Sequence, residues 1–230
     1  MTTHYRKSRI LGLAFLIQFV TSFSAGVFVL PAATGVRAFG LPLEIGQIMA
    51  NVAKNANLVR LNIFIELITA AGVIFLGAML YSAVRKQHEG LALTAFGLYV
   101  LEGVLIAATK LTLYALMVLS QRFVAAGSPA SMEATASLVY KLMEFLPKMN
   151  SILYCVGGTI FYALLLKART VARPLSLWGL VSFLGVFAAG VLSLFGAKVS
   201  VFLYVPYIPF ELFIAIWILV KGINKEIEYK

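Results

Sequence analysis

Hydrophobic residues dominate this sequence in six long runs, which polar or mixed segments separate from one another. A helix needs about 20 mainly apolar residues to cross the roughly 30 Å hydrocarbon layer of a bilayer. The pattern therefore predicts six transmembrane helices, at about 10–30, 61–84, 91–119, 149–166, 175–195 and 202–220. The first run could also be a cleaved signal peptide, but its length and the membrane character of the following chain favour a retained helix.

Two connecting segments show a different pattern, in which apolar residues recur at helical spacing opposite a polar face. The first covers 41–60, where Pro42 lies in the first turn. The second begins at Ser128 and Pro129, which are typical of an N-cap and a first helical residue. We expect both to form amphipathic helices that lie on the membrane surface, with a solvated loop as the alternative for the first.

The composition agrees with a chain whose main solvent is lipid. Of its 230 residues, 61% are hydrophobic and only 12% are charged, whereas soluble domains are usually about one quarter charged. The expected fold class is an all-α polytopic bundle that forms a single integral membrane domain over residues 1–230. The net charge of +10 does not indicate nucleic-acid binding, because the basic residues flank apolar runs instead of forming one tract or face.

The distribution of lysine and arginine predicts the orientation of the chain in the membrane. Eleven of them lie in the two tails, the 85–90 turn and the 167–174 turn, whereas seven are spread over the longer connections on the other side. We therefore expect both termini to face the cytoplasm and both amphipathic helices to lie on the outer side.

Four ionisable residues interrupt the predicted crossings, namely Glu66, Glu102, Lys110 and Glu211. With the predicted orientation, all of them lie in the middle or outer half of the bilayer, which indicates one acidic pocket open to the outside. A charged residue at the centre costs about 2.5–3.5 kcal/mol to insert, whereas a polar bond between helices returns less than about 1 kcal/mol. This imbalance favours a ligand or proton site, and structural pairing of helices is the alternative.

Other polar groups lie one helical turn from these charges. Asn62 precedes Glu66, Tyr207 precedes Glu211, and Pro209 is expected to free the carbonyl of Val205 from helical bonding. Lys110 can keep one carboxylate ionised while the other carboxyl groups hold protons, as proton coupling or cation binding requires.

Motifs for catalysis, metals and cofactors are not apparent. The chain has no aspartate, one cysteine (Cys155) within an apolar run, and two histidines (His4 and His88) outside the predicted crossings. We expect no cofactor, no metal and no catalytic residue, and an intramembrane enzyme using Glu66 or Glu211 as acid or base is the least favoured hypothesis.

Three stretches resemble a known family. They are LYSAVRKQHEGLALTAFGLYVLEG, ARPLSLWGLVS and VPYIPFELFIAIWILVKGIN. In spacing and order they are similar to segments of a prokaryotic six-helix membrane family known as domain of unknown function 4386. The resemblance covers nearly the whole chain, implies a location in the prokaryotic plasma membrane, places Glu102 and Glu211 at the family's acidic positions, and brings no known activity.

Two positions depart from the pattern of the resembled family. Tyr99 stands where an arginine often lies one turn before the acid of the third helix, and Phe210 stands where a glutamine often precedes the acid of the sixth. Lys110 is a candidate to supply the missing positive charge, so the charge balance of the family site would be kept while its shape is altered.

Two functional hypotheses follow. The first is a non-enzymatic membrane protein that binds or transports a proton, a small cation or an amphipathic molecule such as a lipid at the buried charges. The second is a non-catalytic accessory or assembly subunit, with structural charges and with a membrane partner or a second copy of the chain bound to it.

Overall fold

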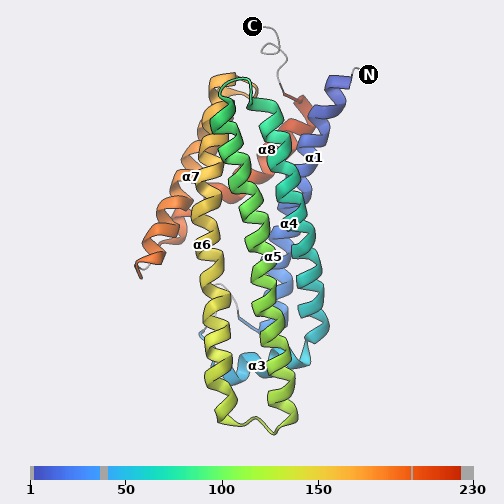
Figure 1. Ribbon diagram of the computed structural model, residues 1–230, viewed down its shortest axis with the longest axis vertical. Helices are drawn as coiled ribbons and strands as arrows, with labels where there is room; N and C mark the ends of the chain where they lie inside the picture. The colour runs from blue at the N-terminus through green and yellow to red at the C-terminus, as the bar shows by residue number, and fades with distance from the viewer. Residues whose placement is uncertain (1–2, 37–40, 198, 224–230) are drawn as a thin grey trace. The chain divides into compact units, whose positions relative to one another are not determined.

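The computed structural model of the chain describes residues 3–36, 41–197 and 199–223, and every regular element in these ranges is a helix. The predicted all-α fold class is confirmed. Figure 1 shows the elements, which are α1 (Thr3–Phe23), the π-helix η1 (Ser24–Val29), α2 (Leu30–Thr34), α3 (Ile45–Lys54), α4 (Ala56–Val84), α5 (Glu89–Ala125), α6 (Ala130–Ala168), α7 (Arg173–Leu194), the 3-10 turn η2 (Val201–Leu203) and α8 (Tyr207–Lys221). Arg37 and Lys198, which contribute to the orientation prediction, lie outside the described residues.

Five helical stretches of the described chain are long and apolar enough to cross a membrane. They are Arg9–Thr34, Ala56–Val84, Glu89–Ala125, Ala130–Ala168 and Arg173–Leu194. Less than half of the most apolar part of each is buried in the protein, and Leu111 and Val181 are 72% and 63% exposed. Because a soluble protein does not expose apolar surface of this extent to water, lipid must cover it. The chain is a multi-pass membrane protein.

The sixth predicted crossing is not confirmed. Residues 202–220 are divided between η2 and the 15-residue helix α8, which is only about 22 Å long. Since α8 begins at Tyr207, Pro209 lies in its first turn, where a missing N–H breaks no helical bond. Val205 therefore lies outside the helix, and the carbonyl that gains side-chain donors is that of Pro206, from Trp178 Nε1 at 3.0 Å and Ser182 Oγ at 3.2 Å.

The two predicted surface helices are also not confirmed as such. The stretch 41–60 contains the short helix α3, and the helix that begins at Ala56 already belongs to α4. The stretch after Pro129 forms the first half of α6, one continuous helix of 39 residues that also contains the predicted fourth crossing. At about 58 Å, α6 is far longer than the hydrocarbon layer.

The chain divides into two compact units. Unit 1 comprises Met1–Phe19, Ala71–Val104 and Lys148–Lys230, and unit 2 comprises Val20–Ala70 and Leu105–Pro147. The helices α1, α4, α5 and α6 contribute residues to both units.

The core of unit 2 explains the amphipathic pattern of α3. The apolar side chains Ile48, Met49 and Val52 of α3 are at most 3% exposed and pack in one cluster with side chains of α5 and α6, such as Phe123 and Ala136. The apolar face of α3 is thus covered by protein and not by the membrane surface.

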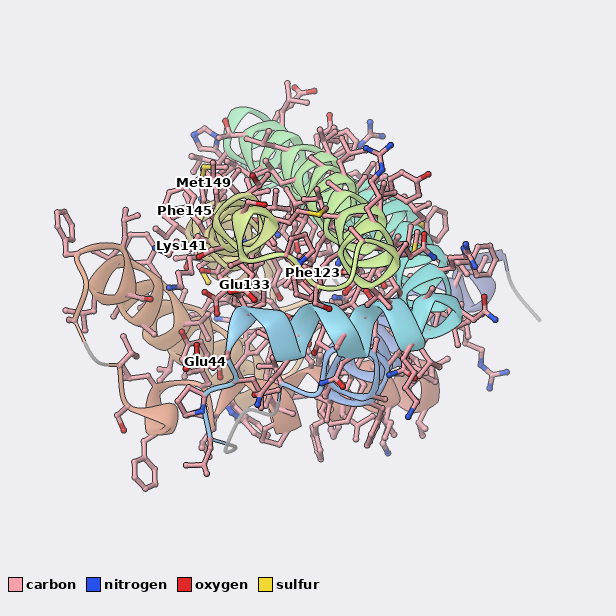
Figure 2. The ribbon with its side chains drawn as sticks, turned by 90° about the horizontal axis from the view of Figure 1, so that it is seen from below. Glu44, Phe123, Glu133, Lys141, Phe145 and Met149 are labelled. Carbon is pink, nitrogen blue, oxygen red and sulfur yellow. The ribbon has the colours of Figure 1, made fainter. Side chains whose placement is uncertain are left out.

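The start of α3 fits closely against α6. A Cβ atom at Gly46 would lie 2.8 Å from the Glu133 carboxylate, and Figure 2 shows Glu133 and Phe123 beside α3. Since Glu133 belongs to the first turn of α6 and lies near the N-terminus of α3, its charge is favourable for the dipoles of both helices.

Unit 1 packs large rings against glycines. A Cβ atom at Gly158 or Gly179 would collide with Phe183 or Phe210, respectively, and one at Gly77 would lie 2.7 Å from the side chain of Tyr99. Small residues at such positions let helices approach closely in lipid. The glycines therefore create the space for the aromatic cluster of this unit.

Candidate functional site

The predicted site residues fall into two groups. Glu66, Lys110 and the supporting residue Asn62 belong to unit 2. The other four predicted residues belong to unit 1, namely Glu102, Glu211, Tyr99 and Tyr207. The common pocket expected for all four charges stays a prediction, and the two groups are described separately here.

In unit 2, α4 and α5 bring Glu66 and Lys110 together. Lys110 Nζ lies 3.4 Å from Glu66 Oε1, and the two side chains are 11% and 16% exposed, respectively. Low dielectric strengthens the attraction between opposite charges and penalises a lone charge. Each of these two largely buried residues therefore reduces the free-energy cost of burying the other. Lys110 thus pairs with the acid of α4, whereas the sequence did not reveal which acid it would meet.

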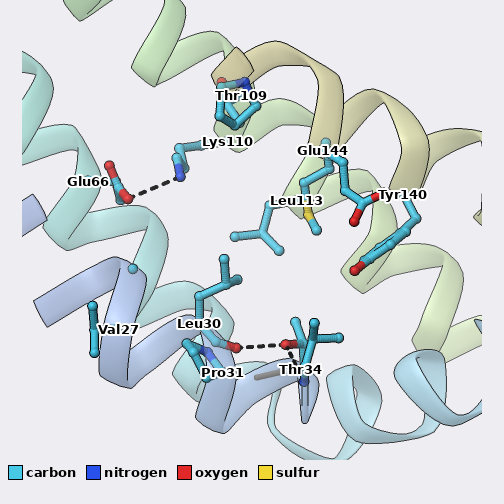
Figure 3. A pocket seen from close by; sticks show the side chains of 14 residues that line it. Val27, Leu30, Pro31, Thr34, Glu66, Thr109, Lys110, Leu113, Tyr140 and Glu144 are labelled. Carbon is cyan, nitrogen blue, oxygen red and sulfur yellow. Dashed lines mark hydrogen bonds and ion pairs between the residues drawn. The ribbon is translucent and has the colours of Figure 1, made fainter. Parts of the chain in front are cut away.

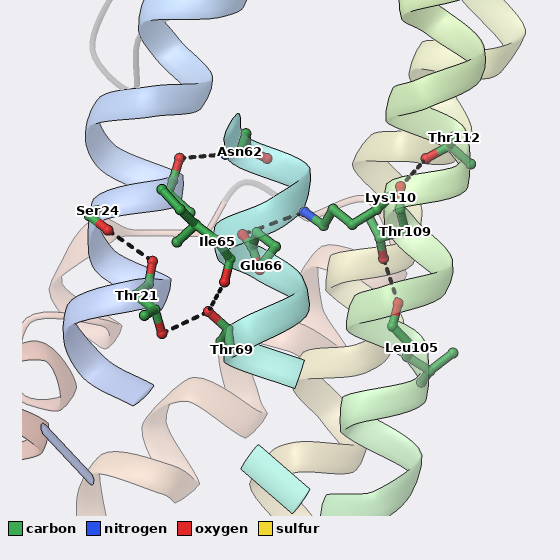
Figure 4. A network of polar contacts seen from close by, with 11 residues as sticks. Thr21, Ser24, Asn62, Ile65, Glu66, Thr69, Leu105, Thr109, Lys110 and Thr112 are labelled. Atoms are coloured by element: carbon green, nitrogen blue, oxygen red, sulfur yellow. Dashed lines mark hydrogen bonds and ion pairs between the residues drawn. The ribbon is translucent and has the colours of Figure 1, made fainter. Parts of the chain in front are cut away.

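Polar bonds fix α4 against the first helical stretch on either side of Glu66 (Figure 4). Asn62 Nδ2 donates to the carbonyl of Ala25 at 2.8 Å, and the hydroxyl groups of Thr69 and Thr21 are 2.8 Å apart. Asn62 therefore has a positioning contact, although its Oδ1 finds no partner among the described residues.

A proline explains the π-helix that carries Ala25. Pro31 has no N–H to give to the carbonyl four residues earlier, and its ring would collide with that carbonyl in a regular α-helix. The chain instead forms η1, in which Leu30 N–H bonds to Ala25 O, five residues back. The wider turn accommodates Pro31 at the start of α2 and places Gly26 and Val27 on the wall of a cavity.

The cavity lies wholly within unit 2 and has a volume of about 720 Å³. Most of its walls are apolar, and the residues of this kind are Val27, Leu30, Pro31, Val36, Leu113, Met143 and Pro147. Its polar lining consists of Thr34, Glu66, Thr109, Lys110, Tyr140 and Glu144. Figure 3 shows the Glu66–Lys110 pair apart from Tyr140 and Glu144, with Leu113 between them.

Several of the polar wall groups are already occupied. Thr34 donates its hydroxyl to the carbonyl of Leu30 at 2.9 Å, and Thr109 donates to that of Leu105 at 2.8 Å. The ion pair, in contrast, uses one of three donors of Lys110 and one of two oxygens of Glu66. The cavity therefore combines mainly apolar walls with one ion pair, Glu66–Lys110, whose remaining donors and acceptor can still form hydrogen bonds.

In unit 1, the carboxylate of Glu211 is held by tyrosines. Tyr154 of α6 donates to Glu211 Oε1 at 3.0 Å, Tyr207 donates to the same oxygen from one turn earlier on α8, and the two tyrosine hydroxyls contact each other. The ring of Phe183 packs on both tyrosine rings, with centroids 5.0 and 5.4 Å away. These contacts join α6, α7 and α8 around one carboxylate.

Glu102 lies within electrostatic range of Glu211 but has fewer contacts. It is 5% exposed, and its Oε2 has no hydrogen-bond partner among the described residues. Tyr99, one turn earlier, packs its ring against Tyr154 at 5.8 Å and Phe161 at 5.1 Å. Tyr99, at the position where the resembled family often has an arginine, therefore belongs to the aromatic packing of this unit.

Within the described ranges, no group of three histidine, cysteine, aspartate or glutamate residues is placed to hold a metal ion. Neither Glu102 nor Glu211 forms an ion pair with a described residue.

Three features of these sites were not predicted from the sequence. Pro31 directly follows the predicted first crossing at 10–30, whereas the helical stretch continues past it to Thr34, and its effect on helix geometry was not predicted. Tyr154 was placed on a polar face of its helix, but its partner Glu211 lies 57 residues away. Tyr140 and Glu144 were assigned to a surface helix, so their place on the wall of a cavity had no sequence signal.

A family model described as "Domain of unknown function (DUF4386)" matches residues 10–222 of the chain. No curated protein matches the chain. No solved structure matches it either.

Proposed function

The chain belongs to the DUF4386 family, and from this premise we propose that it binds a small amphipathic molecule in the cavity of unit 2. The observation that carries the proposal is the Glu66–Lys110 ion pair on the wall of a mainly apolar cavity of about 720 Å³. Ligand sites typically combine an apolar lining with a few polar groups that orient the ligand, in volumes of roughly 300–1,000 Å³.

The volume and the lining favour an amphipathic molecule over the other ligands expected from the sequence. A proton or a small cation needs a few oxygen atoms and no apolar chamber, whereas a hydrocarbon chain gains about 0.8 kcal/mol for each buried methylene group. The polar head would then meet Glu66 and Lys110, and the tail would lie against side chains such as Leu30, Leu113 and Met143.

The predicted orientation supports access to the cavity from the outer leaflet. With both termini in the cytoplasm, Glu66 and Lys110 lie in the outer half of the bilayer. We propose on this basis that the ligand enters from the outer leaflet of a prokaryotic plasma membrane.

For Glu211 we propose the structural role that the sequence left as an alternative. Two tyrosine hydroxyls from different helices bind its Oε1, and Phe183 packs directly on their rings. This arrangement favours a fixed junction of helices over a site that exchanges a ligand.

A glycine offers a direct test of ligand binding. Gly26 lines the cavity and a Cβ atom there would meet no atom within 4 Å, so Gly26→Trp would add an indole ring at the cavity wall without a backbone collision. We expect it to weaken the binding of radiolabelled dodecylphosphocholine to the protein in lipid nanodiscs by roughly tenfold or more, equivalent to about 1.4 kcal/mol. Empty nanodiscs give the background of partition into lipid.

Gly97→Trp is the matched control, because Gly97 is an exposed helical glycine of α5 that also has no atom within 4 Å of an added Cβ and does not line the cavity. It should bind the amphiphile like the unaltered protein. Equal binding by both variants, or no binding above that of empty nanodiscs, would show that the cavity is not the site.

A further inference from the structure

The ligand cavity has two opposite charges at one point, and their balance restricts the chemistry of the ligand. Glu66 and Lys110 neutralise each other at 3.4 Å, and they belong to different helices of the same unit. Resting on the proposed function, we infer that the cavity selects an amphiphile with a zwitterionic head, whose anionic group meets Lys110 and whose cationic group meets Glu66.

The argument follows from the cost of an unpaired charge in an apolar surrounding. An anionic head that pairs with Lys110 would draw it away from Glu66 and leave that carboxylate without a counter-charge. A cationic head would do the reverse to Lys110. Because removing one partner of a buried pair is costly, only a head that carries both charges keeps every charge paired.

The bonding capacity of the pair agrees with this inference. The ion pair is the one polar contact that the Lys110 ammonium makes with the described residues, so two of its three donors remain for a ligand anion. Glu66 likewise keeps its second oxygen for a ligand cation. Both side chains line the cavity, so a head group in it reaches both charges from the same side.

The other charge on the cavity wall does not alter this balance. Glu144 is exposed on α6, and Figure 3 shows it beside Tyr140 and away from the ion pair. Glu144 lies apart from the pair, whereas Glu66 and Lys110 are within ion-pair distance of each other and are largely buried. The head preference is therefore set at Glu66 and Lys110.

The test compares three amphiphiles that share a dodecyl chain and differ in the charge of the head. They are dodecylphosphocholine (zwitterionic), dodecyl phosphate (anionic) and dodecyltrimethylammonium (cationic). Each competes below its micellar concentration with a radiolabelled amphiphile for the protein in nanodiscs. We expect the unaltered protein to prefer dodecylphosphocholine by roughly tenfold over both others.

Two single variants are expected to change this preference in opposite directions. Lys110→Met leaves Glu66 alone and should favour the cationic amphiphile, whereas Glu66→Gln leaves Lys110 alone and should favour the anionic one. The double variant Glu66→Gln/Lys110→Met has no charge at this point and should lose the preference while it still binds the tail. If a single variant does not fold, the double variant still tests whether the head preference depends on these two charges.

The outcomes separate this inference from the proposed function. Binding of all three amphiphiles with equal affinity, unchanged in the variants, would overturn the zwitterion inference and leave an amphiphile site in place. A stable preference for one singly charged head in the unaltered protein would also overturn it. Absence of binding above empty nanodiscs, or equal competition by phosphocholine without a tail, would overturn the proposed amphiphile site itself.

Discussion

Lys110 and Glu66 each carry a charge into an apolar part of the molecule, where each depends on the other. Their presence was predictable, because a charge within an apolar run is visible in any membrane sequence. Their pairing was not, because the sequence gives the position of a residue along its helix but not the rotation of that helix against its neighbours. For the same reason Tyr154 was not recognised as a partner of Glu211.

The pairing predicts a specific pattern of stability. Lys110→Met should lower the free energy of unfolding by about 3 kcal/mol, because it leaves the Glu66 carboxylate without a partner. The double variant Glu66→Gln/Lys110→Met should recover most of this loss. Reversible unfolding of the detergent-solubilised protein measures both, with Lys54→Met as the control at an exposed lysine of unit 2. Strictly additive losses in the double variant would show that the two side chains do not interact.

The tyrosines around Glu211 predict a second effect at the residue scale. Tyr207→Phe removes one of the hydroxyl groups that bind Glu211 Oε1 and should cost about 1–3 kcal/mol, since a partly buried carboxylate loses a donor. Tyr114→Phe is the matched control, because Tyr114 is 54% exposed on α5. The same unfolding measurement applies, and equal losses in the two variants would remove Glu211 from the structural role proposed here.

At the scale of elements, apolar pattern and helix boundaries are different properties. The stretch from Lys141 to Met149 contains three charged residues, so hydropathy predicted the end of one element and the start of another. Lysine, leucine, methionine and glutamate are all good helix formers, however, and the stretch contains no glycine. The backbone continues through it as α6, although Pro147 lies inside the helix and has no N–H to give to the carbonyl of Met143.

Pro31 shows the converse case, in which the helical geometry changes within one continuous helical stretch, Arg9–Thr34. Pro31→Ala restores an N–H that can bond to the carbonyl of Val27, so η1 should revert to a regular α-helix. We expect amphiphile binding to weaken by roughly tenfold, because Gly26 and Val27 would leave their places on the cavity wall, while thermal stability is kept.

Pro174→Ala is the control for this prediction, because Pro174 lies in the first turn of α7, where its missing N–H breaks no helical bond. Binding by nanodisc-embedded protein and thermal unfolding are measured side by side for both variants. Unchanged affinity in Pro31→Ala would mean that the π-helix does not shape the cavity.

At the scale of the whole molecule, composition was sufficient for the class of protein, because 61% hydrophobic residues cannot be covered by a single soluble core. The number of membrane crossings was harder to predict from the sequence. The residues of α8 are as apolar as those of the other helices, but the helix begins only after Pro206 and has 15 residues. Run length alone does not reveal this.

The predicted orientation can be tested with single cysteines, because the chain has only one native cysteine, Cys155, which is buried. In a Cys155→Ala background, Ser128→Cys lies in the exposed turn between α5 and α6, and His88→Cys lies in the exposed turn between α4 and α5. A membrane-impermeant maleimide applied to intact cells should label the first and not the second. Labelling of His88→Cys alone would reverse the orientation and the proposed entry from the outer leaflet.

The central claim is that an amphipathic molecule occupies the cavity beside Glu66 and Lys110, and photo-crosslinking tests it most directly. A dodecylphosphocholine with a diazirine in its chain is irradiated with the protein in nanodiscs, and the labelled peptides are identified by mass spectrometry. We predict adducts concentrated in residues 26–36, 109–113 and 140–147, and their loss in Gly26→Trp but not in Gly97→Trp. Adducts spread evenly over exposed apolar residues outside these ranges, such as Leu93 and Val181, and unchanged in Gly26→Trp, would contradict the claim.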